Sequence, residues 1–307
     1  MFRPSREIRA FYNEHSVRVY QAYSDVIADS ALKHQTFVSP PFSMTRMTWI
    51  KPSFLWMMYR AGWGKKEEGQ ERILAIDITH EGFAWAIANS SPSHPAPDMN
   101  YDEWRQALEK APVRIQWDPE RDLRHNPLAH RTIQIGLRGE AVKRYTKTWI
   151  KGISDETSLA HDVHDLVLKD EHETAYTLLP REKPYLVGMN RQQYLAVERE
   201  QLLDPAHYAH EEIVALLQRY PENESVPYLR KAILLKPSLL YLEYDDYGAF
   251  YKKCLWALQD IGTPEAIALI EECLLSDDPV LKDQALYRLK SIAAGGRGGV
   301  QFPRERD

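Results

Sequence analysis

The sequence predicts an α+β protein, with a mixed or antiparallel sheet in an N-terminal domain and helical hairpins alone in a C-terminal domain. Strand and helix patterns interleave without a regular βαβ period, which favours an α+β sheet over a doubly wound one. From about residue 207 only helical patterns follow. A chain of 307 residues also exceeds the usual size of one core. We therefore expect domains at residues 1–200 and 201–295 and a flexible, glycine-rich tail at 296–307.

The elements of the first domain follow from local patterns. Apolar residues at helical spacing predict a helix over Ser16–Leu32, and Pro52 suits the first turn of a helix that opens near Lys51. The apolar run at 73–78 predicts a strand, after which Thr79 is expected to cap a helix over 80–89. The remaining expected elements are a helix at 101–110, strands at 113–117 and 131–137, and a helix at 140–150.

Two start signals organise the C-terminal domain. Thr263-Pro264-Glu265 combines an N-cap, a proline at the first helical position and an acidic first turn, and Ser276-Asp277-Asp278-Pro279 repeats that arrangement. Helices of about a dozen residues separated by such turns resemble HEAT-type or armadillo-type repeats, in which each hairpin buries its apolar face on the next. We therefore expect a HEAT-like helical domain.

Composition places the chain among ordinary globular proteins. Apolar residues make up 44% and charged residues 27%, which argues against disorder. No stretch approaches the roughly 18 consecutive apolar residues that a membrane helix needs, and Met1–Arg9 is too polar for a secretory signal. We expect a cytoplasmic protein without membrane contact. Cys254 and Cys273 lie in apolar helical patterns, so buried free thiols are expected rather than a disulfide.

The net charge of -5 conceals an asymmetry between the two halves of the chain. Residues 1–150 carry 21 basic and 17 acidic side chains, a balance of +4, whereas residues 151–307 carry 18 and 27, a balance of -9. An anionic partner is therefore expected to meet the N-terminal half.

A basic, aromatic segment between Lys33 and Lys66 is the strongest candidate for a functional site. No acidic residue occurs between Asp29 and Glu67. The interval holds these basic and aromatic residues: Lys33, Phe37, Phe42, Arg46, Trp49, Lys51, Phe54, Trp56, Tyr59, Arg60, Trp63, Lys65 and Lys66. Cations neutralise phosphate and aromatic faces stack on bases, so this mixture is typical of sites for nucleotides or single-stranded nucleic acid.

Particular residues within this segment are assigned roles. Hydroxyls, cations and a helix N-terminus that converge at one place make an anion pocket. We expect phosphate contacts from Arg46, Thr48, Lys51 and Arg60, with Trp49 and Trp56 stacking on a base. The competing interpretation is that the helix is mainly core, with an ordinary basic rim.

Five motifs carry a resemblance to a known family. They are Ile8-Arg9-Ala10, Val19-Tyr20-Gln21-Ala22-Tyr23, Arg46-Met47-Thr48-Trp49-Ile50-Lys51-Pro52-Ser53-Phe54, Gln116-Trp117-Asp118-Pro119-Glu120-Arg121 and Ile133-Gln134-Ile135-Gly136-Leu137. Over about residues 3–189 the chain resembles an uncharacterised domain-of-unknown-function family, the one catalogued as four-two-nine-one. The resemblance implies no established activity, and the C-terminal helices lie outside it.

One enzymatic hypothesis is a similarity to ADP-ribosyltransferase-like folds, which use NAD. In those α+β domains an early strand supplies an Arg or His, and a later strand presents a Glu that orients the ribose. Arg9, within an expected strand or arm at residues 5–11, and Glu140, just after the expected strand at 131–137, are our candidates for these catalytic roles. A carboxylate near the ribose stabilises the developing oxocarbenium charge.

Two non-catalytic hypotheses remain beside this one. The basic aromatic surface alone would suit a module that binds RNA or single-stranded DNA, with binding that weakens as salt rises. The acidic helical domain would suit a scaffold that docks a basic protein partner.

Other chemistries find little support in the sequence. His161 and His164 stand three residues apart with acidic neighbours, but no third metal ligand is fixed by spacing, so no metal is expected. No Gly-x-Ser-x-Gly elbow occurs, which argues against a serine hydrolase. Gly62-Trp63-Gly64-Lys65-Lys66 lacks both the spacing and the hydroxyl of a P-loop.

Overall fold

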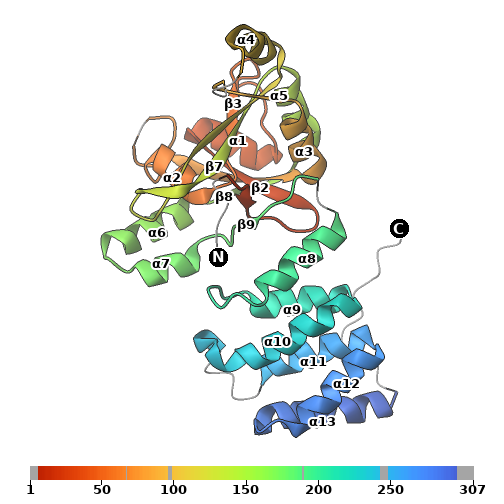
Figure 1. The fold of residues 1–307 in the computed structure, drawn as a ribbon. Coiled ribbons are helices and arrows are strands. Elements are labelled where there is room, and N and C mark those ends of the chain that lie inside the picture. Colours follow the sequence, from red (N-terminus) through yellow and green to blue (C-terminus); the bar gives the residue numbers. More distant parts are fainter. Residues whose placement is uncertain (1–5, 67, 96–98, 189, 243–247, 296–307) are drawn as a thin grey trace. The chain divides into compact units, whose positions relative to one another are not determined.

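A computed structural model gives the fold of the chain, which divides into two compact units at residues 1–191 and 192–307 (Figure 1). The structure describes residues 6–66, 68–95, 99–188, 190–242 and 248–295. The expected tail at 296–307 lies outside the described residues. The α+β class is confirmed, with mixed and antiparallel sheets in the first unit and helices in the second.

The first unit interleaves strands and helices throughout. Its strands are β1 (Arg9–Ala10), β2 (Ser16–Tyr23), β3 (Thr48–Ile50), β4 (Arg72–Thr79), β5 (Ser90–Pro92), β6 (Val113–Arg121), β7 (Pro127–Leu137), β8 (Ile150–Asp155) and β9 (Lys183–Pro184). Its α-helices are α1 (Asp25–His34), α2 (Phe54–Ala61), α3 (His80–Ala88), α4 (Tyr101–Lys110), α5 (Glu140–Arg144), α6 (Thr157–Leu168) and α7 (His172–Leu178), and the π-helix η1 (Tyr145–Trp149) continues α5.

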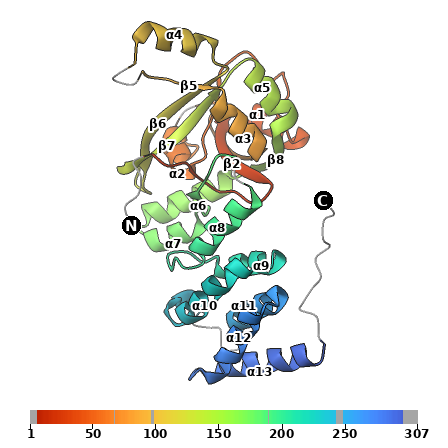
Figure 2. The ribbon, with the colours of Figure 1, turned by 45° about the vertical axis from the view of Figure 1, so that its right-hand side comes forward.

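Three sheets organise these strands. One sheet has the order β2-β4-β8 and is antiparallel throughout. A second has the order β3-β7-β6-β5, in which only the β5–β6 pair is parallel; Figure 2 labels β5, β6 and β7 of this sheet. In a third sheet β1 pairs with β9. The isolated bridge between Tyr20 and Lys51 connects β2 to the end of β3. Lys51 therefore lies where two sheets meet.

The helix predicted over Ser16–Leu32 is wrong in its first half. Residues 16–23 form β2, which pairs with β4 along its whole length, and α1 starts only at Asp25. The β-branched residues Val17 and Val19 are fully buried in this strand. Strand pairing across the chain outweighs the helical spacing because β-branched side chains fit a pleated surface well.

Several local predictions in this unit are confirmed. Thr79 caps α3, since its Oγ1 accepts a hydrogen bond from the backbone N–H of Gly82 at 3.0 Å. α4 spans the residues predicted. The helix expected to open near Lys51 is present as α2, but it begins after its N-cap Ser53, so Pro52 precedes the helix instead of lying in its first turn. The strands at 113–117 and 131–137 are present but longer, as β6 and β7.

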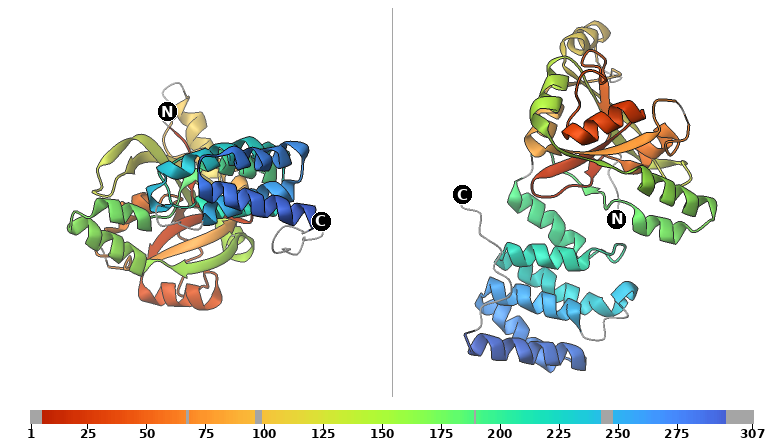
Figure 3. Two further views of the ribbon diagram at one scale, coloured as in Figure 1. Left: turned by 90° about the horizontal axis from the view of Figure 1, so that it is seen from below. Right: turned by 180° about the vertical axis from the view of Figure 1, so that it is seen from behind.

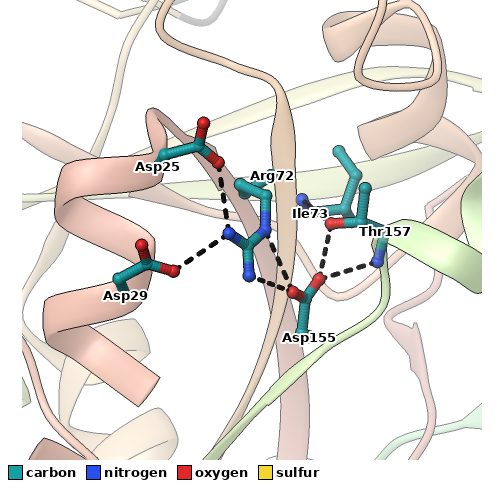
Figure 4. Close-up of polar contacts among 6 residues, drawn as sticks. All are labelled: Asp25, Asp29, Arg72, Ile73, Asp155 and Thr157. Atoms are coloured by element: carbon teal, nitrogen blue, oxygen red, sulfur yellow. Dashed lines mark hydrogen bonds and ion pairs between the residues drawn. The ribbon is translucent and has the colours of Figure 1, made fainter. Parts of the chain in front are cut away.

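Arg72 ties the start of β4 to two other elements (Figure 4). Its Nη1 lies 3.1 Å from Asp25 Oδ1 and 3.0 Å from Asp29 Oδ1, both on α1, and its guanidinium also pairs with Asp155 at the end of β8. Thr157 Oγ1 accepts a hydrogen bond from the backbone N–H of Ile73 at 3.0 Å. The network thus fixes one end of the β2-β4-β8 sheet against α1 and the start of α6.

The second unit is helical in all its described elements. Its α-helices are α8 (Arg191–Gln201), α9 (His210–Arg219), α10 (Val226–Leu235), α11 (Ala249–Ile261), α12 (Pro264–Glu272) and α13 (Pro279–Ala293), with short 3₁₀ turns η2 (Asn223–Ser225), η3 (Lys236–Ser238), η4 (Leu240–Leu242) and η5 (Cys273–Leu275). α11 packs against α9, α10, α12 and α13, so it forms the centre of this unit (Figure 3).

The predicted start signals of this unit are confirmed. Thr263 Oγ1 accepts from the backbone N–H of Ala266, and Asp278 Oδ1 accepts from Val280 and Leu281. Cys254 and Cys273 are free and buried, as predicted. The assignment of these helices to the HEAT type stays a prediction. Among the described residues, no helix combines the length and apolar character needed to span a bilayer.

Candidate functional site

One face of the β3-β7-β6 sheet is polar. In the register of these strands Trp49 stands opposite Gly136 and Gly136 opposite Arg114, while Gln134 pairs with Gln116 and Thr132 with Asp118. Directly opposed residues in an antiparallel pair share a face, and alternate residues along a strand do so too. The polar face therefore comprises Trp49, Arg114, Gln116, Asp118, Thr132, Gln134 and Gly136.

Asp118 lies opposite Thr132 on this polar face and fixes the two glutamines of the neighbouring pair. Its Oδ1 accepts a hydrogen bond from Gln116 Nε2 at 2.9 Å, and its Oδ2 accepts one from Gln134 Nε2 at 2.7 Å. Each amide is thereby oriented, with its nitrogen toward the carboxylate and its carbonyl oxygen directed elsewhere. The face thus offers a fixed carboxylate with an amide acceptor on either side.

Trp49 packs closely against the neighbouring strand. A Cβ atom placed on Gly136 would lie 3.0 Å from both Cε2 and Cη2 of the Trp49 indole and 3.0 Å from Met47 Sδ. Glycine at position 136 lets the Trp49 ring approach the sheet. Trp49 itself remains partly exposed. The indole is therefore held in place at the edge of the polar face.

Lys51 follows β3 directly and is only 7% exposed. Its Nζ donates to the Trp49 carbonyl oxygen at 3.2 Å and lies 5.6 Å from the ring centroid of Trp56. Burial, and then the positive charge of Arg60, lowers the pKa of Lys51 to about 7, against the opposing effect of Asp118. Lys51 is therefore not the permanent cation that a simple phosphate-binding role assumes.

Two carboxyl groups meet the start of α2, and we call Glu120 and Glu182 the acid pair. Ser53 Oγ donates to Glu120 Oε1 at 2.9 Å and accepts from the backbone N–H of Trp56 at 3.1 Å. The backbone N–H of Phe54 donates to Glu182 Oε1 at 2.5 Å. The acid pair thus occupies the positive end of the helix dipole.

Both members of the acid pair hold their protons more tightly than ordinary glutamates. Burial raises the pKa of Glu120, and burial together with the charge of Glu120 raises the pKa of Glu182 well above its usual range. The hydrogen bond from Phe54 and the charge of Arg9 act in the opposite direction on Glu182. Two such carboxyls cannot both ionise at low cost, so Glu182 keeps its proton to a higher pH than an isolated glutamate does.

Two buried polar atoms beside these groups have no hydrogen-bond partner among the described residues. They are the indole Nε1 of Trp56, which is 6% exposed, and the hydroxyl of Tyr20, which is fully buried. Buried polar groups are nearly always hydrogen-bonded, so an orphaned donor indicates a place for an external acceptor. The Trp56 donor belongs to the same indole that lies beside the Lys51 amine.

The structure brings some of the predicted site residues together. Lys51, Trp49 and Trp56 gather at the polar face, and the charge of Arg60, at the end of α2, reaches Lys51. Arg46 is exposed in the loop before β3. Thr48 is buried on the opposite face of the strand, where it hydrogen-bonds with Tyr23.

The two predicted catalytic residues lie in different places. Arg9 is on β1, where it pairs with Glu7 at 3.2 Å and donates to the backbone carbonyl of Glu182 at 2.9 Å. Glu140 is exposed at the start of α5 and pairs with Arg144 at 2.7 Å. Figure 1 shows α5 near the top of this unit and β9, the partner of β1, at its lower edge. The structure therefore does not bring Arg9 and Glu140 to one site.

Sequence reasoning missed Gln116, Asp118, Gln134 and the acid pair. A signal for the first three was present, because polar residues alternate with Ile115, Trp117, Ile133 and Ile135 along the two strands. Glu182 carries no local signal, since only the pairing of β9 with β1 brings it to α2. Among the described residues, no group of three or more His, Cys, Asp or Glu side chains could hold a metal ion.

Comparison with protein families gives one match. Residues 7–185 match the model of the family described as Domain of unknown function (DUF4291). The chain belongs to this family. The matched region contains the whole polar face and both members of the acid pair, and it ends before α8. No curated protein matches the chain.

Proposed function

We propose that this DUF4291 domain binds a nucleotide on its polar face and acts on the glycosidic bond of that nucleotide, with NAD as the candidate substrate. One observation carries the proposal. An indole, two oriented amides, a fixed carboxylate and a buried amine, from Trp49, Gln116, Gln134, Asp118 and Lys51, converge where two sheets meet.

Each group has a task that its chemistry suits. Trp49 stacks on a base, and the amide carbonyl oxygens of Gln116 and Gln134 accept from ribose hydroxyls or from the base edge. Lys51 takes up a proton when a phosphate binds beside it, because a nearby anion favours the charged amine. Trp56 Nε1 donates to a ligand oxygen.

In this scheme Asp118 has the catalytic role that sequence reasoning assigned to Glu140. Departure of nicotinamide from NAD leaves positive charge on the ribose ring, and a fixed carboxylate stabilises that charge in the transition state. Water or an acceptor nucleophile then attacks the anomeric carbon. Glu140, exposed and paired with Arg144, has no part in this scheme.

The test measures NAD binding by calorimetry and nicotinamide release by chromatography. We expect binding in the micromolar to millimolar range, and we expect Asp118→Asn to lower the turnover rate by about 100-fold while binding remains, as when one electrostatic group is lost. Glu109→Gln, an exposed carboxylate on α4, is the matched control and should change neither quantity.

The pH dependence of binding has a definite sign. Lys51 is charged below its pKa of about 7, so NAD affinity should be highest below pH 7 and should fall as the pH rises to 9. Uptake of a proton on binding at pH 8, measured by calorimetry in two buffers, checks the same point. Salt-sensitive RNA retention without nicotinamide release would favour the nucleic-acid module, and the absence of binding to either ligand would refute the proposal.

A further inference from the structure

Lys51 is placed as a reactive amine rather than as a surface cation. Its side chain is buried, and among the described residues its nitrogen has one hydrogen-bond acceptor, the carbonyl oxygen of Trp49. An ammonium group carries three N–H donors, so two would stay unsatisfied in a buried site, whereas a neutral amine leaves less to satisfy. The geometry alone thus favours the uncharged, nucleophilic form.

The surroundings favour the same form. The Trp56 indole covers one side of the amine, and the positive charge of Arg60 acts on it from the end of α2. Desolvation next to a second cation is a recognised way to activate a lysine for attack on a carbonyl carbon. The lowered pKa of Lys51 agrees with this arrangement.

We propose that Lys51 forms an imine with an open-chain sugar aldehyde seated on the polar face. The Nζ lone pair attacks the carbonyl carbon, and the carbonyl oxygen takes up a proton to give a carbinolamine. The nitrogen loses a proton, the hydroxyl leaves as water, and a C=N bond replaces the C=O bond. One molecule of water is released, and nothing is oxidised or reduced.

The polar face fits a sugar in particular. The Trp49 indole offers an apolar surface to the carbon-bound hydrogens of the chain, and Gln116 and Gln134 present carbonyl oxygens to its hydroxyls. The Asp118 carboxylate, whose charge already acts on Lys51, stabilises the positive charge of the protonated imine. The inference rests on the proposed function only in placing its ligand on the same face.

A second buried lysine supplies an internal control. Lys183 on β9 is 2% exposed, its Nζ lies 4.3 Å from the ring centroid of Tyr12, and burial lowers its pKa to about 6. Lys183 therefore shares the lowered pKa of Lys51 but belongs to the β1-β9 sheet, outside the polar face. If a low pKa alone decided reactivity, Lys183 would react at least as fast as Lys51.

The experiment traps the imine in the full chain. The wild-type protein is incubated with ribose 5-phosphate and sodium cyanoborohydride at pH 7.5, and adducts are located by peptide mass spectrometry. We expect the adduct on Lys51 to form at least about tenfold faster than on exposed Lys143, because an ordinary lysine is about one-thousandth neutral at this pH. We expect the same advantage over Lys183, because Lys183 lies outside the polar face that binds the sugar. Ribitol 5-phosphate, which has no carbonyl, should slow labelling of Lys51 and leave Lys143 unchanged.

The labelling pattern of the wild type decides the matter without relying on any variant. The proposal would be overturned if Lys51 were labelled no faster than Lys143, or if Lys183 were labelled faster than Lys51. Asp118→Asn adds a second measurement and should slow the Lys51 reaction specifically. NAD binding is measured separately and without aldehyde, so binding without labelling refutes the imine alone, and labelling without binding refutes the nucleotide proposal alone.

Discussion

The two units bury charged groups in contrasting ways. In the helical unit Arg199 is 6% exposed, and its guanidinium donates to Ser225 Oγ at 2.9 Å and to Glu222 Oε2 at 2.5 Å. In the sheet unit Lys51 is buried with only a backbone carbonyl as acceptor among the described residues, and the acid pair brings two carboxyls together. A buried charge that keeps an oppositely charged partner fits a structural role, whereas a buried group pushed toward neutrality is a candidate for function when other polar groups gather beside it, as they do beside Lys51 on the polar face, to which Lys183 does not belong.

The largest effect is expected from breaking the paired charge. Arg199→Met should lower the free energy of unfolding of the helical unit by roughly 3 kcal/mol, because Glu222 and buried Ser225 lose their partner. Chemical denaturation followed by circular dichroism measures the change. Arg230→Met, which removes an exposed pair with Glu272, should cost less than about 1 kcal/mol. Equal losses of unfolding free energy in both variants would show that the buried pair stabilises the unit no more than the exposed pair does.

A second test concerns the acid pair and its pH dependence. Below pH 4.5 both the folded and the unfolded chain hold the Glu182 proton. As the pH rises above that value the unfolded chain releases the proton first, so the contribution of Glu182 to stability falls. Glu182→Gln should therefore gain stability relative to the wild type between pH 5 and pH 8, measured by thermal unfolding at each pH. The matched surface change Glu140→Gln should leave the dependence of stability on pH unaltered. If the stability of Glu182→Gln followed pH as that of the wild type does, the raised pKa of Glu182 would be contradicted.

Replacement of the unpaired amine should have the opposite outcome to Arg199→Met. Lys51→Met keeps most of the side-chain volume and removes a desolvated amine, so stability should stay equal or rise by up to about 1 kcal/mol. NAD binding should be lost in the same variant. A gain in stability with loss of binding is the usual sign of a residue kept for function. Strong destabilisation of Lys51→Met would show instead that Lys51 stabilises the fold.

The smallest effect is expected at Glu140. Glu140→Ala removes an exposed i,i+4 pair with Arg144, which is worth about 0.3 to 0.5 kcal/mol. Nicotinamide release should not change, since Glu140 lies away from the polar face. A loss of turnover as large as that of Asp118→Asn would return Glu140 to the catalytic role that the sequence suggested.

The sequence predicts the helical unit better than the sheet unit, for a physical reason. Caps such as Thr263 and Asp278 bond to residues two or three positions further along, so a short stretch of sequence is enough to predict their effect. The helical spacing at 16–23 predicts a helix, whereas the strand depends on pairing with β4, whose residues lie 49 to 63 positions further along the chain. Within the site, Lys51, Trp49 and Trp56 could be found from composition, but their burial could not.

The candidate catalytic carboxylates also depend on contacts between residues far apart in the sequence. The sequence points to Glu140 because it follows a strand, whereas the pairing of β7 with both β6 and β3 places Asp118 on the same face as Trp49. A count of charges treats every lysine as a cation. The burial of Lys51, to which the Trp56 ring contributes, is visible only in the structure, and it lowers the pKa of the amine. Residues named from the basic segment therefore point to β3 and α2, which border the candidate site, but not to the carboxylates beside them.

One hydroxyl connects Glu120 of the acid pair to the backbone of Trp56, the residue whose indole covers Lys51. Ser53 Oγ gives its hydrogen to Glu120 while it receives the N–H of Trp56, so a single oxygen belongs to both hydrogen bonds. A change in the protonation state of Glu120 therefore changes the strength of a hydrogen bond made by the N-cap of α2, three residues ahead of Trp56.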